Sequence, residues 1–168
     1  MKTFLISDLH FGHTNVIKYC NRPFKDVDAM NTRLIKNWNR VVGKNDIVYY
    51  LGDFARYYPK KYLRELNGTI FFILGNHDVP SLIKADIHPV LRRHIIHYKG
   101  ESILLVHDPR EINKPRKWNG WAIHGHTHNN EMSDYPSVNY KRKTLNVSCE
   151  LRNYTPIELS ELLETRRL

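Results

Sequence analysis

Five short apolar runs that end close to polar residues constrain this chain more than any other feature. They cover residues 3–7, 47–51, 70–74, 103–106 and 121–123. Their length and their content of valine, isoleucine, phenylalanine and tyrosine are typical of buried β-strands. Aspartate, asparagine or histidine follows each run within two residues. The sequence therefore predicts strands whose ends carry residues capable of chemistry.

The segments between these runs predict helices. In residues 27–42 apolar side chains recur at steps of three and four, which indicates an amphipathic helix, and Gly43 is placed to end it. A second, short helix is expected around 62–66, and Thr155-Pro156 is expected to open a C-terminal helix. Alternating strands and helices predict parallel strand pairing, with ligands bound outside the carboxyl ends of the strands.

Length and composition favour one globular domain over residues 1–168. The chain is 41% hydrophobic and 26% charged, and no linker or repeat divides it. Its first residues show neither an export signal nor a membrane span. Cys20 and Cys149 fit neither a metal knuckle nor a disulfide framework, so ordinary thiols and a cytoplasmic location are expected.

The net charge of +9 at pH 7 predicts an anionic partner. It does not choose between nucleic acid, a nucleotide and a phosphorylated metabolite. The basic clusters at 92–93, 114–117 and 141–143 are interpreted either as solvated loop charge or as contacts to phosphate. No membrane partner is predicted, and the oligomeric state stays open.

The polar residues at the strand ends are of metal-ligand types. They are Asp8, His10, Asp53, Asn76, His77, His107, His126 and His128. On a strand that continues, residues two apart point to the same side, which suits two ligands of one ion. Mixed carboxylate oxygen and imidazole nitrogen favour Mn, Fe, Co, Ni or Zn over Mg or Ca. Each segment taken alone could also be a turn or a helix cap. Three imidazoles within residues 124–128, however, would repel one another when protonated unless a cation or carboxylates lay nearby.

In this order the motifs resemble the calcineurin-like metallophosphoesterase family, whose pattern is D-x-H, G-D, G-N-H-D/E, a lone H, and G-H-x-H. Here these are Asp8-Leu9-His10, Gly52-Asp53, residues 75–78, His107 and residues 125–128. The resemblance implies a four-layer α/β sandwich, with two mixed β-sheets packed face to face and helices outside. It also implies two divalent metal ions, with Mn the first choice and Fe, Zn, Ni or Co as alternatives.

The family pattern also implies roles for individual residues. Asp8, His10 and His128 would hold the first ion, while Asn76, His107 and His126 would hold the second, with Asp53 bridging both. A hydroxide between the ions would attack the phosphate ester. His77 would lie beside the phosphate as a catalytic residue, with Asp78 orienting or charging its ring, or it would instead form a hydrogen bond to a metal-ligating carboxylate.

Two departures from the family pattern bear on the substrate. Asp108-Pro109 follows His107 where many relatives have glycine, which predicts a carboxylate near the substrate that disfavours highly anionic monoesters. Residues 52–58 lack the G-D-x-x-D-R-G extension of the protein-phosphatase branch. A phosphodiesterase is therefore favoured over a protein phosphatase.

His13, Asn15 and Arg56 are candidate substrate contacts because they follow the first two motifs closely, although His13 could instead cap or pack a helix. His124 is expected in the core or behind the ligands. Trp118, Trp121, Tyr57 and Tyr58 could stack on a base or pack at the rim. The predicted enzyme is a phosphodiesterase or phosphomonoesterase acting on a nucleotide-like or other small phosphorylated compound. The alternatives are a nuclease acting on nucleic acid and a non-catalytic metal-containing binding module.

Overall fold

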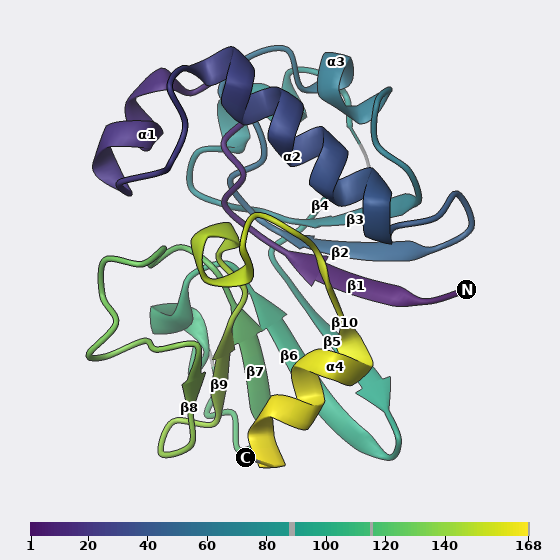
Figure 1. Cartoon of the computed structure of the whole chain (residues 1–168). Coiled ribbons are helices and arrows are strands. Elements are labelled where there is room, and N and C mark those ends of the chain that lie inside the picture. The colour runs from purple at the N-terminus through teal and green to yellow at the C-terminus, as the bar shows by residue number, and fades with distance from the viewer. Residues whose placement is uncertain (88–89, 115, 168) are drawn as a thin grey trace.

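The computed structural model describes residues 1–87, 90–114 and 116–167 and contains two five-stranded sheets (Figure 1). In the first sheet, ordered β10-β1-β2-β3-β4, strands β1 to β4 are parallel and β10 is antiparallel to β1. Its strands are β1 (Thr3–Ile6), β2 (Ile47–Leu51), β3 (Thr69–Ile73), β4 (Val90–Leu91) and β10 (Ile157–Glu158). The predicted parallel pairing of this sheet is confirmed.

The second sheet has the order β5-β6-β7-β9-β8. Strands β6, β7 and β9 are parallel, while β5 and β8 are antiparallel to their neighbours. The strands are β5 (Arg93–Tyr98), β6 (Glu101–Val106), β7 (Trp121–His124), β8 (Val138–Asn139) and β9 (Thr144–Asn146). Both sheets are thus mixed, and each has three or more parallel strands whose carboxyl ends lie together at one edge.

Helices α2 and α3 lie over the outer face of the first sheet, and α1 lies to one side, beyond the carboxyl ends of its strands (Figure 1). The helices of the chain are α1 (Thr14–Tyr19), α2 (Val27–Val41), α3 (Pro59–Leu63) and α4 (Leu159–Glu164). A π-helical turn at Val79–Ile83 and 3-10 turns at Pro109–Glu111, Cys149–Arg152 and Thr165–Arg167 complete the helical segments. Helix α2 begins where the Asp26 side chain accepts a hydrogen bond from the amide of Ala29, which caps the helix.

The two sheets pack face to face through one apolar cluster. It contains Leu5, Leu51 and Ile73 from the first sheet and Ile103, Leu105, Ile123 and Leu145 from the second, closed at one side by Leu159, Leu162 and Leu163 of α4. The outer face of the second sheet is covered by Ile112, after a 3-10 turn, and by Trp118. The predicted four-layer α/β sandwich is confirmed, with the fourth layer thinner than expected.

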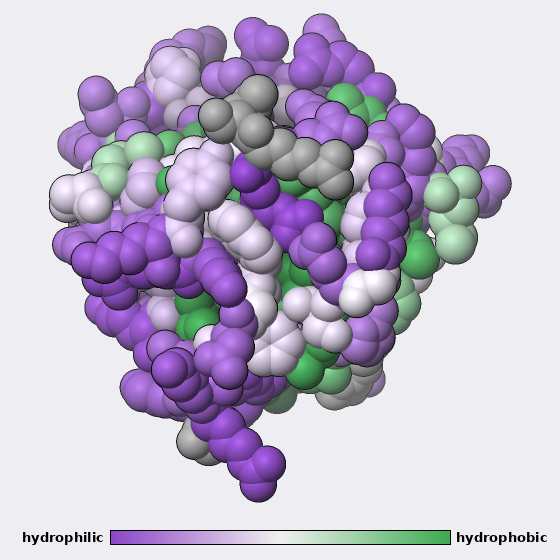
Figure 2. Space-filling view, turned by 90° about the horizontal axis from the view of Figure 1, so that it is seen from below, coloured by the Kyte–Doolittle hydropathy of each residue, from purple (hydrophilic) through white to green (hydrophobic). Residues whose placement is uncertain are grey.

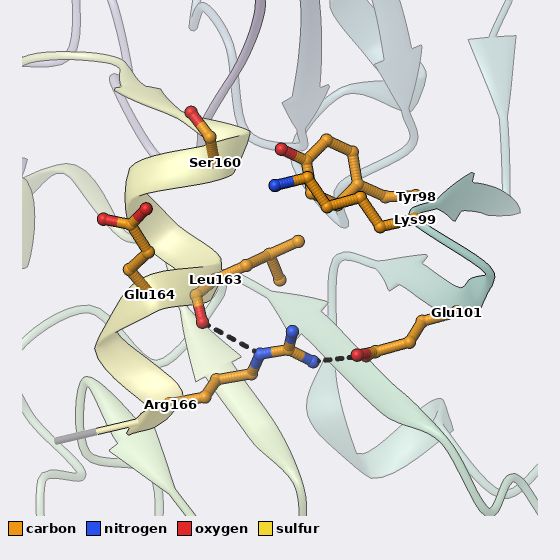
Figure 3. Close-up of a pocket in the computed structure, with 7 residues that line it drawn as sticks. All are labelled: Tyr98, Lys99, Glu101, Ser160, Leu163, Glu164 and Arg166. Atoms are coloured by element: carbon orange, nitrogen blue, oxygen red, sulfur yellow. Dashed lines mark hydrogen bonds and ion pairs between the residues drawn. The ribbon is translucent and has the colours of Figure 1, made fainter.

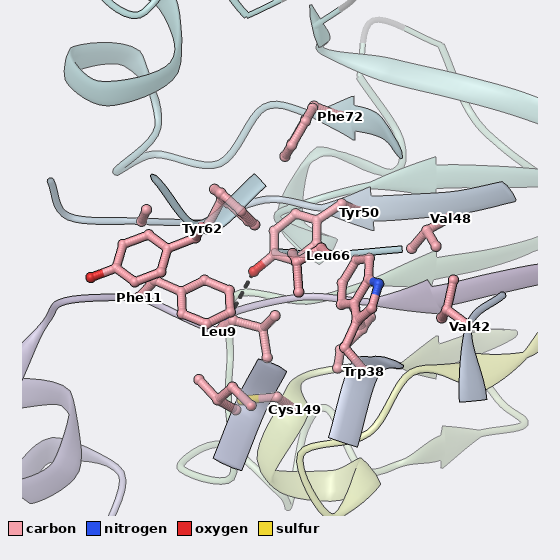
Figure 4. Packing of buried hydrophobic residues seen from close by; sticks show 14 of the residues in the cluster. Leu9, Phe11, Trp38, Val42, Val48, Tyr50, Tyr62, Leu66, Phe72 and Cys149 are labelled. Carbon is pink, nitrogen blue, oxygen red and sulfur yellow. Dashed lines mark hydrogen bonds between the residues drawn. The ribbon is translucent and has the colours of Figure 1, made fainter. Parts of the chain in front are cut away.

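Helix α2 packs on the first sheet around Tyr50 of β2. Trp38 and Tyr50 are fully buried, with ring centroids 6.3 Å apart (Figure 4). The Tyr50 hydroxyl accepts a hydrogen bond from the amide of Leu9 at 2.8 Å and donates one to the carbonyl of Asp53 at 3.2 Å. This core side chain therefore joins the loops after β1 and β2, which carry the first two motifs.

Two predicted helix boundaries were wrong. The C-terminal helix does not open at Thr155-Pro156, because Ile157–Glu158 forms β10 and the helix begins at Leu159. The free edge of β1 offers backbone groups that β10 satisfies by pairing, and this long-range contact overrides the local helix preference. The second helix lies earlier than 62–66, at Pro59–Leu63, since proline suits a first helical turn.

The C-terminal segment is held against the hairpin of β5 and β6. Arg166 donates from Nη1 to Glu101 at 2.7 Å and from Nε to the carbonyl of Leu163 at 3.1 Å (Figure 3). These residues border a cavity of about 120 Å³ that includes none of the predicted ligands. The face at this end of the molecule is mostly hydrophilic, with apolar side chains visible only in patches (Figure 2). None of the described helices has the length and apolar character to cross a membrane.

Candidate metal centre and active site

The first three predicted ligands of one ion lie together although they come from distant segments. Asp8, His10 and His128 each place a ligand atom within 4.8 Å of the others. The rings of His10 and His128 stack with centroids 5.2 Å apart, and His128 Nε2 is 3.9 Å from Asp8 Oδ1. The loop after β1 and the loop after β7 thus form one side of the site.

The predicted ligands of the second ion converge more tightly. His126 Nδ1 lies 3.0 Å from Asn76 Oδ1 and 3.1 Å from His107 Nε2, and the latter two atoms are 3.0 Å apart. Ligands bound at right angles around a cation at about 2.1 Å lie about 3.0 Å from one another. The three atoms are therefore spaced as ligands of one cation would be.

Asp53 lies between the two groups. Its Oδ2 is 3.5 Å from His10 Nε2 and 3.6 Å from His107 Nε2. Burial raises the pKa of Asp53 to about 6, even though the nearby His107 acts to lower it. A buried carboxylate that faces imidazoles on both sides is suited to a position between two cations, whose charge would favour its ionised form.

The Nε2 atoms of His107 and His10 are available to bind a metal ion. His107 Nδ1 donates to the carbonyl of Leu51 at 2.8 Å, so its Nε2 carries the lone pair. His10 Nε2 is buried and has no hydrogen-bond partner among the residues that the structure describes. A buried polar atom without a partner is costly, so a cation at this position accounts for its place in the fold. The donor set fits divalent metal ions.

The predicted reason for the convergence of Asp8 with His10 was wrong. Strand β1 ends at Ile6 and β7 at His124, so neither D-x-H nor H-x-H lies on a continuing strand. Left-handed backbone turns bring these side chains together instead, with positive φ at Asp8, His10, Asp53, His126 and His128. Such angles are strained for residues other than glycine and cluster at functional sites.

Gly75 and Gly125 each lie against a ligand side chain from a different motif. A Cβ on Gly75 would be 2.2 Å from Asp53 Oδ1, and one on Gly125 would be 2.6 Å from Asp8 Oδ2. Neither distance is compatible with a side chain. The glycines therefore allow loops of different strands to touch, which is what brings the ligands together.

Asp78 does not have the place predicted for it. Its carboxylate is fully buried and accepts hydrogen bonds from the amides of Asp53 and Gly75 at Oδ2 and from Phe54 at Oδ1, at 2.8 to 2.9 Å. Both oxygens therefore accept hydrogen bonds from the backbone, and among the described residues no hydrogen bond or ion pair joins them to the His77 ring. Asp78 ties the loop after β2 to the loop after β3.

The remaining predicted site residues occupy different positions. His77 is exposed, and its ring meets that of His10 edge-on at 5.5 Å. His13 caps α1 by accepting a hydrogen bond from the amide of Val16, which confirms the capping interpretation. Its ring lies 5.6 Å from that of His10, and a contact of His13 with substrate stays a prediction. Asn15 is exposed on α1, and its contact with substrate stays a prediction.

Arg56 follows a bridge between Ala55 and Phe11 that sets it beside the first motif. It is exposed, and its guanidinium carbon lies 5.6 Å from the centre of the Tyr57 ring. Tyr19, which the sequence did not single out, is 68% exposed, and its ring lies 6.4 Å from that of His13. Burial and the charge of Arg56 both lower the pKa of His13, so the guanidinium and the Tyr19 ring lie near this imidazole.

Asp108 does not offer a free carboxylate to the substrate, contrary to the sequence prediction. Arg110 Nε lies 2.9 and 3.1 Å from its two oxygens. Burial acts to raise the pKa of Asp108, but the hydrogen bonds from Arg110 outweigh it and the pKa is lowered. Arg110 also contacts His126, so the pair adds a guanidinium to this side of the site. Arg110 stands three residues after His107, but no local pattern distinguishes it from a solvated arginine.

A cavity of about 220 Å³ opens beside the second group. Asn76, His107 and Asp108 line it together with Val79 and Arg92. Cys20, His128 and Glu150 form a further cluster of ligand types. There, however, Arg22 lies 2.7 Å from Glu150, and its positive charge opposes a cation.

His124 is fully buried behind the ligands, as expected, and its Nδ1 is 2.9 Å from the carbonyl of Gly125. Burial lowers its pKa to about 4.

The low pKa of His124 makes stability depend on pH. Between pH 6.5 and 4 this imidazole is protonated in the unfolded chain but not in the folded protein, so the free energy of unfolding falls by up to about 3 kcal/mol as the pH falls through this range. We expect His124→Gln to remove this loss. Urea unfolding of the wild type and the variant at pH 7 and 4.5 measures the fall in the free energy of unfolding for each. An equal fall in the two proteins would contradict the prediction.

A model of the calcineurin-like phosphoesterase superfamily domain matches residues 1–147. The chain therefore belongs to the calcineurin-like phosphoesterase superfamily. Membership supports a metal-dependent phosphoesterase activity in general, and the groups of ligand side chains described above are consistent with divalent metal ions.

Individual proteins are similar to this chain in sequence or in fold. The uncharacterized protein MJ1445 of Methanocaldococcus jannaschii is 46% identical over 168 residues, covering 97% of this chain and 90% of that protein. The Gene 66 protein of Mycobacterium phage L5 is 36% identical over 95 residues, covering 53% of this chain and 45% of that protein. The crystal structure of AQ665, a protein of unknown function from Aquifex aeolicus, superposes with a TM-score of 0.77 at 29% identity, covering 98% of both chains.

Proposed function

We propose that this protein is a phosphoesterase that uses two divalent metal ions. One ion would be held by Asp8, His10 and His128, the other by Asn76, His107 and His126, with Asp53 bonded to both. The observation that carries the proposal is the position of Asp53 Oδ2, at 3.5 and 3.6 Å from one imidazole of each group. The mixed oxygen and nitrogen donors favour manganese, with iron, zinc, nickel and cobalt as candidates.

When bound, two such ions would lower the pKa of water toward neutrality and stabilise negative charge on the phosphate oxygens. Two further side chains of the protein, those of His77 and Arg110, are placed to act on the phosphate group of the substrate. His77 is exposed beside His10, where its imidazole can donate a hydrogen bond to a phosphate oxygen or a proton to the leaving oxygen. Arg110, held by Asp108, adds a fixed positive charge near His126.

We propose a nucleotide-like or other small phosphorylated compound as the substrate. The net charge of +9 favours an anion. The rings of His10, His13 and Tyr19 succeed one another at 5.6 and 6.4 Å, and the exposed Arg56 lies near enough to His13 for its charge to add to burial in lowering the pKa of that imidazole. Aromatic rings and a guanidinium at this position suit the stacking of a base while its phosphate lies between the ligand groups.

Activity assays in Mn²⁺ test this function. We expect the protein to hydrolyse bis-p-nitrophenyl phosphate or p-nitrophenyl phosphate, and to lose the activity when EDTA removes the metal. The ratio of the two rates measures diester preference. Cleavage of oligonucleotides alone would favour the nuclease. Inactivity on both aryl esters, on nucleotides and on oligonucleotides would contradict the proposal and favour a non-catalytic binding module.

His77→Asn tests the proposed acid separately from the metals. We expect kcat to fall by about 10²- to 10⁴-fold, the usual contribution of a positioned acid, while bound Mn²⁺ per protein stays as in wild type. His97→Asn, which replaces an exposed imidazole on β5, is the control and should keep full activity. Unchanged turnover of the His77 variant would remove this residue from the mechanism.

A further inference from the structure

A buried ion pair lies directly behind the first group of ligands. Arg22 comes from the segment between α1 and α2, and Glu150 from the 3-10 turn after β9. Their side chains are 0% and 3% exposed, and Glu150 Oε1 accepts hydrogen bonds from Arg22 Nη2 at 2.7 Å and Nε at 2.9 Å. The pair lies 128 residues apart in sequence, and no motif includes it.

Arg22 also holds the backbone of the first motif. Its Nη2 donates to the carbonyl of Asp8 at 2.6 Å, and its Nη1 donates to the carbonyl of Leu9 at 2.9 Å. These are the peptide groups between Asp8 and His10, whose φ angles are 60° and 52°. Left-handed angles at two such residues persist only where the surroundings fix them. Here the Arg22 guanidinium holds the two carbonyls, while the Tyr50 hydroxyl and the loop after β2 hold the amides.

Glu150 holds the third ligand of the same group. Its Oε1 accepts a hydrogen bond from His128 Nδ1 at 3.0 Å. This fixes the ring orientation and leaves Nε2, on the side of Asp8, with the lone pair. A carboxylate behind an imidazole also increases its basicity and hence its strength as a ligand.

The ion pair is poorly explained by stability alone. Burying both charges costs desolvation energy, and well-packed apolar residues of similar volume commonly serve a fold as well or better. In the described structure the second ligand group has no buried pair of this kind: His107 donates to the backbone carbonyl of Leu51, and the Asp108–Arg110 pair beside His126 is partly exposed. Apart from the sulfur contacts of Arg22 to Met30 and Cys149, the hydrogen bonds that the pair makes to other residues go to His128 and to the backbone between Asp8 and His10.

We propose that Arg22 and Glu150 are positioning residues that set the metal affinity of the site formed by Asp8, His10 and His128. The inference rests on the proposed function, because it assumes that this group binds a cation. It adds that a single guanidinium–carboxylate pair sets the geometry of all three ligands, and that the site formed by Asn76, His107 and His126 is largely independent of it.

Titration of metal-free protein with Mn²⁺ by calorimetry tests this inference. We expect Glu150→Gln to weaken one of two binding events by about 10- to 100-fold, as is typical when the partner of a metal-bound histidine is lost, and to leave the other little changed. Repeating the titration in a His126→Ala background assigns the weakened event to the first site. Glu158→Gln, which disrupts the exposed pair with Lys2, is the control and should bind both ions normally.

A double variant separates positioning from folding. Arg22→Met with Glu150→Leu replaces the pair by apolar residues, and we expect a denaturant midpoint near that of wild type together with an affinity that remains low at the first site. Wild-type affinity in Glu150→Gln and in the double variant, or equal weakening of both sites in step with lost stability, would overturn the inference. If wild-type protein binds no Mn²⁺ at all, the proposed function fails and the inference fails with it.

Discussion

Asp53→Asn is expected to reduce turnover by about 10³-fold or more. Removing one group that stabilises a transition state usually costs up to about 10³-fold. The reason is that Asp53 Oδ2 faces both ligand groups, so a neutral amide there weakens two cation sites at once. Kinetics with an aryl phosphate in saturating Mn²⁺ and metal analysis of the purified variant measure the effect.

Asp28→Asn is the matched control for this prediction, because it makes the same chemical change at an exposed position in the first turn of α2. It should leave turnover and metal content unchanged. An Asp53 variant with wild-type kinetics and two bound ions would show that this carboxylate does not belong to the metal centre.

Asp78→Ala is expected to lower the free energy of unfolding by at least about 3 kcal/mol, because three buried backbone amides lose a charged acceptor. For a chain of this size the melting temperature should fall by about 6 to 12 °C. Turnover should fall as well, since Asp78 fixes the loops that carry Asp53 and Asn76. Thermal and urea unfolding measure the first effect.

The same variant distinguishes the structure from the role that the sequence had predicted. If Asp78 acted on the His77 ring, its loss would lower turnover and leave stability intact. Asp134→Ala removes a carboxylate whose side chain is 66% exposed and should change neither. A stable Asp78→Ala protein would contradict the structural account.

The sequence predicted three strands of the first sheet, β1, β2 and β3, because each is a continuous apolar run closed by a polar residue. The strand predicted at 47–51 coincides with β2, and the helix predicted at 27–42 differs from α2 by one residue. The short strands β8, β9 and β10, of two or three residues, are too brief for any periodicity. Their existence depends on pairing with distant segments.

The candidate ligands were predictable because the family motifs list them, and their convergence follows from the carboxyl ends of parallel strands. Their surroundings were not predictable. Asp78 has the same local sequence whether it faces His77 or accepts three amides, and only the approach of the β2 and β3 loops decides this. Arg22 and Glu150 meet across 128 residues, so no local pattern connects them.

A crystal structure of the protein grown with excess Mn²⁺, with an anomalous difference map, tests the central claim most directly. We predict two peaks about 3.5 to 4 Å apart, the separation of two-metal phosphoesterase sites, with Asp53 bonded to both. A single peak, or peaks that leave Asp53 without a metal bond, would contradict the two-ion centre proposed here.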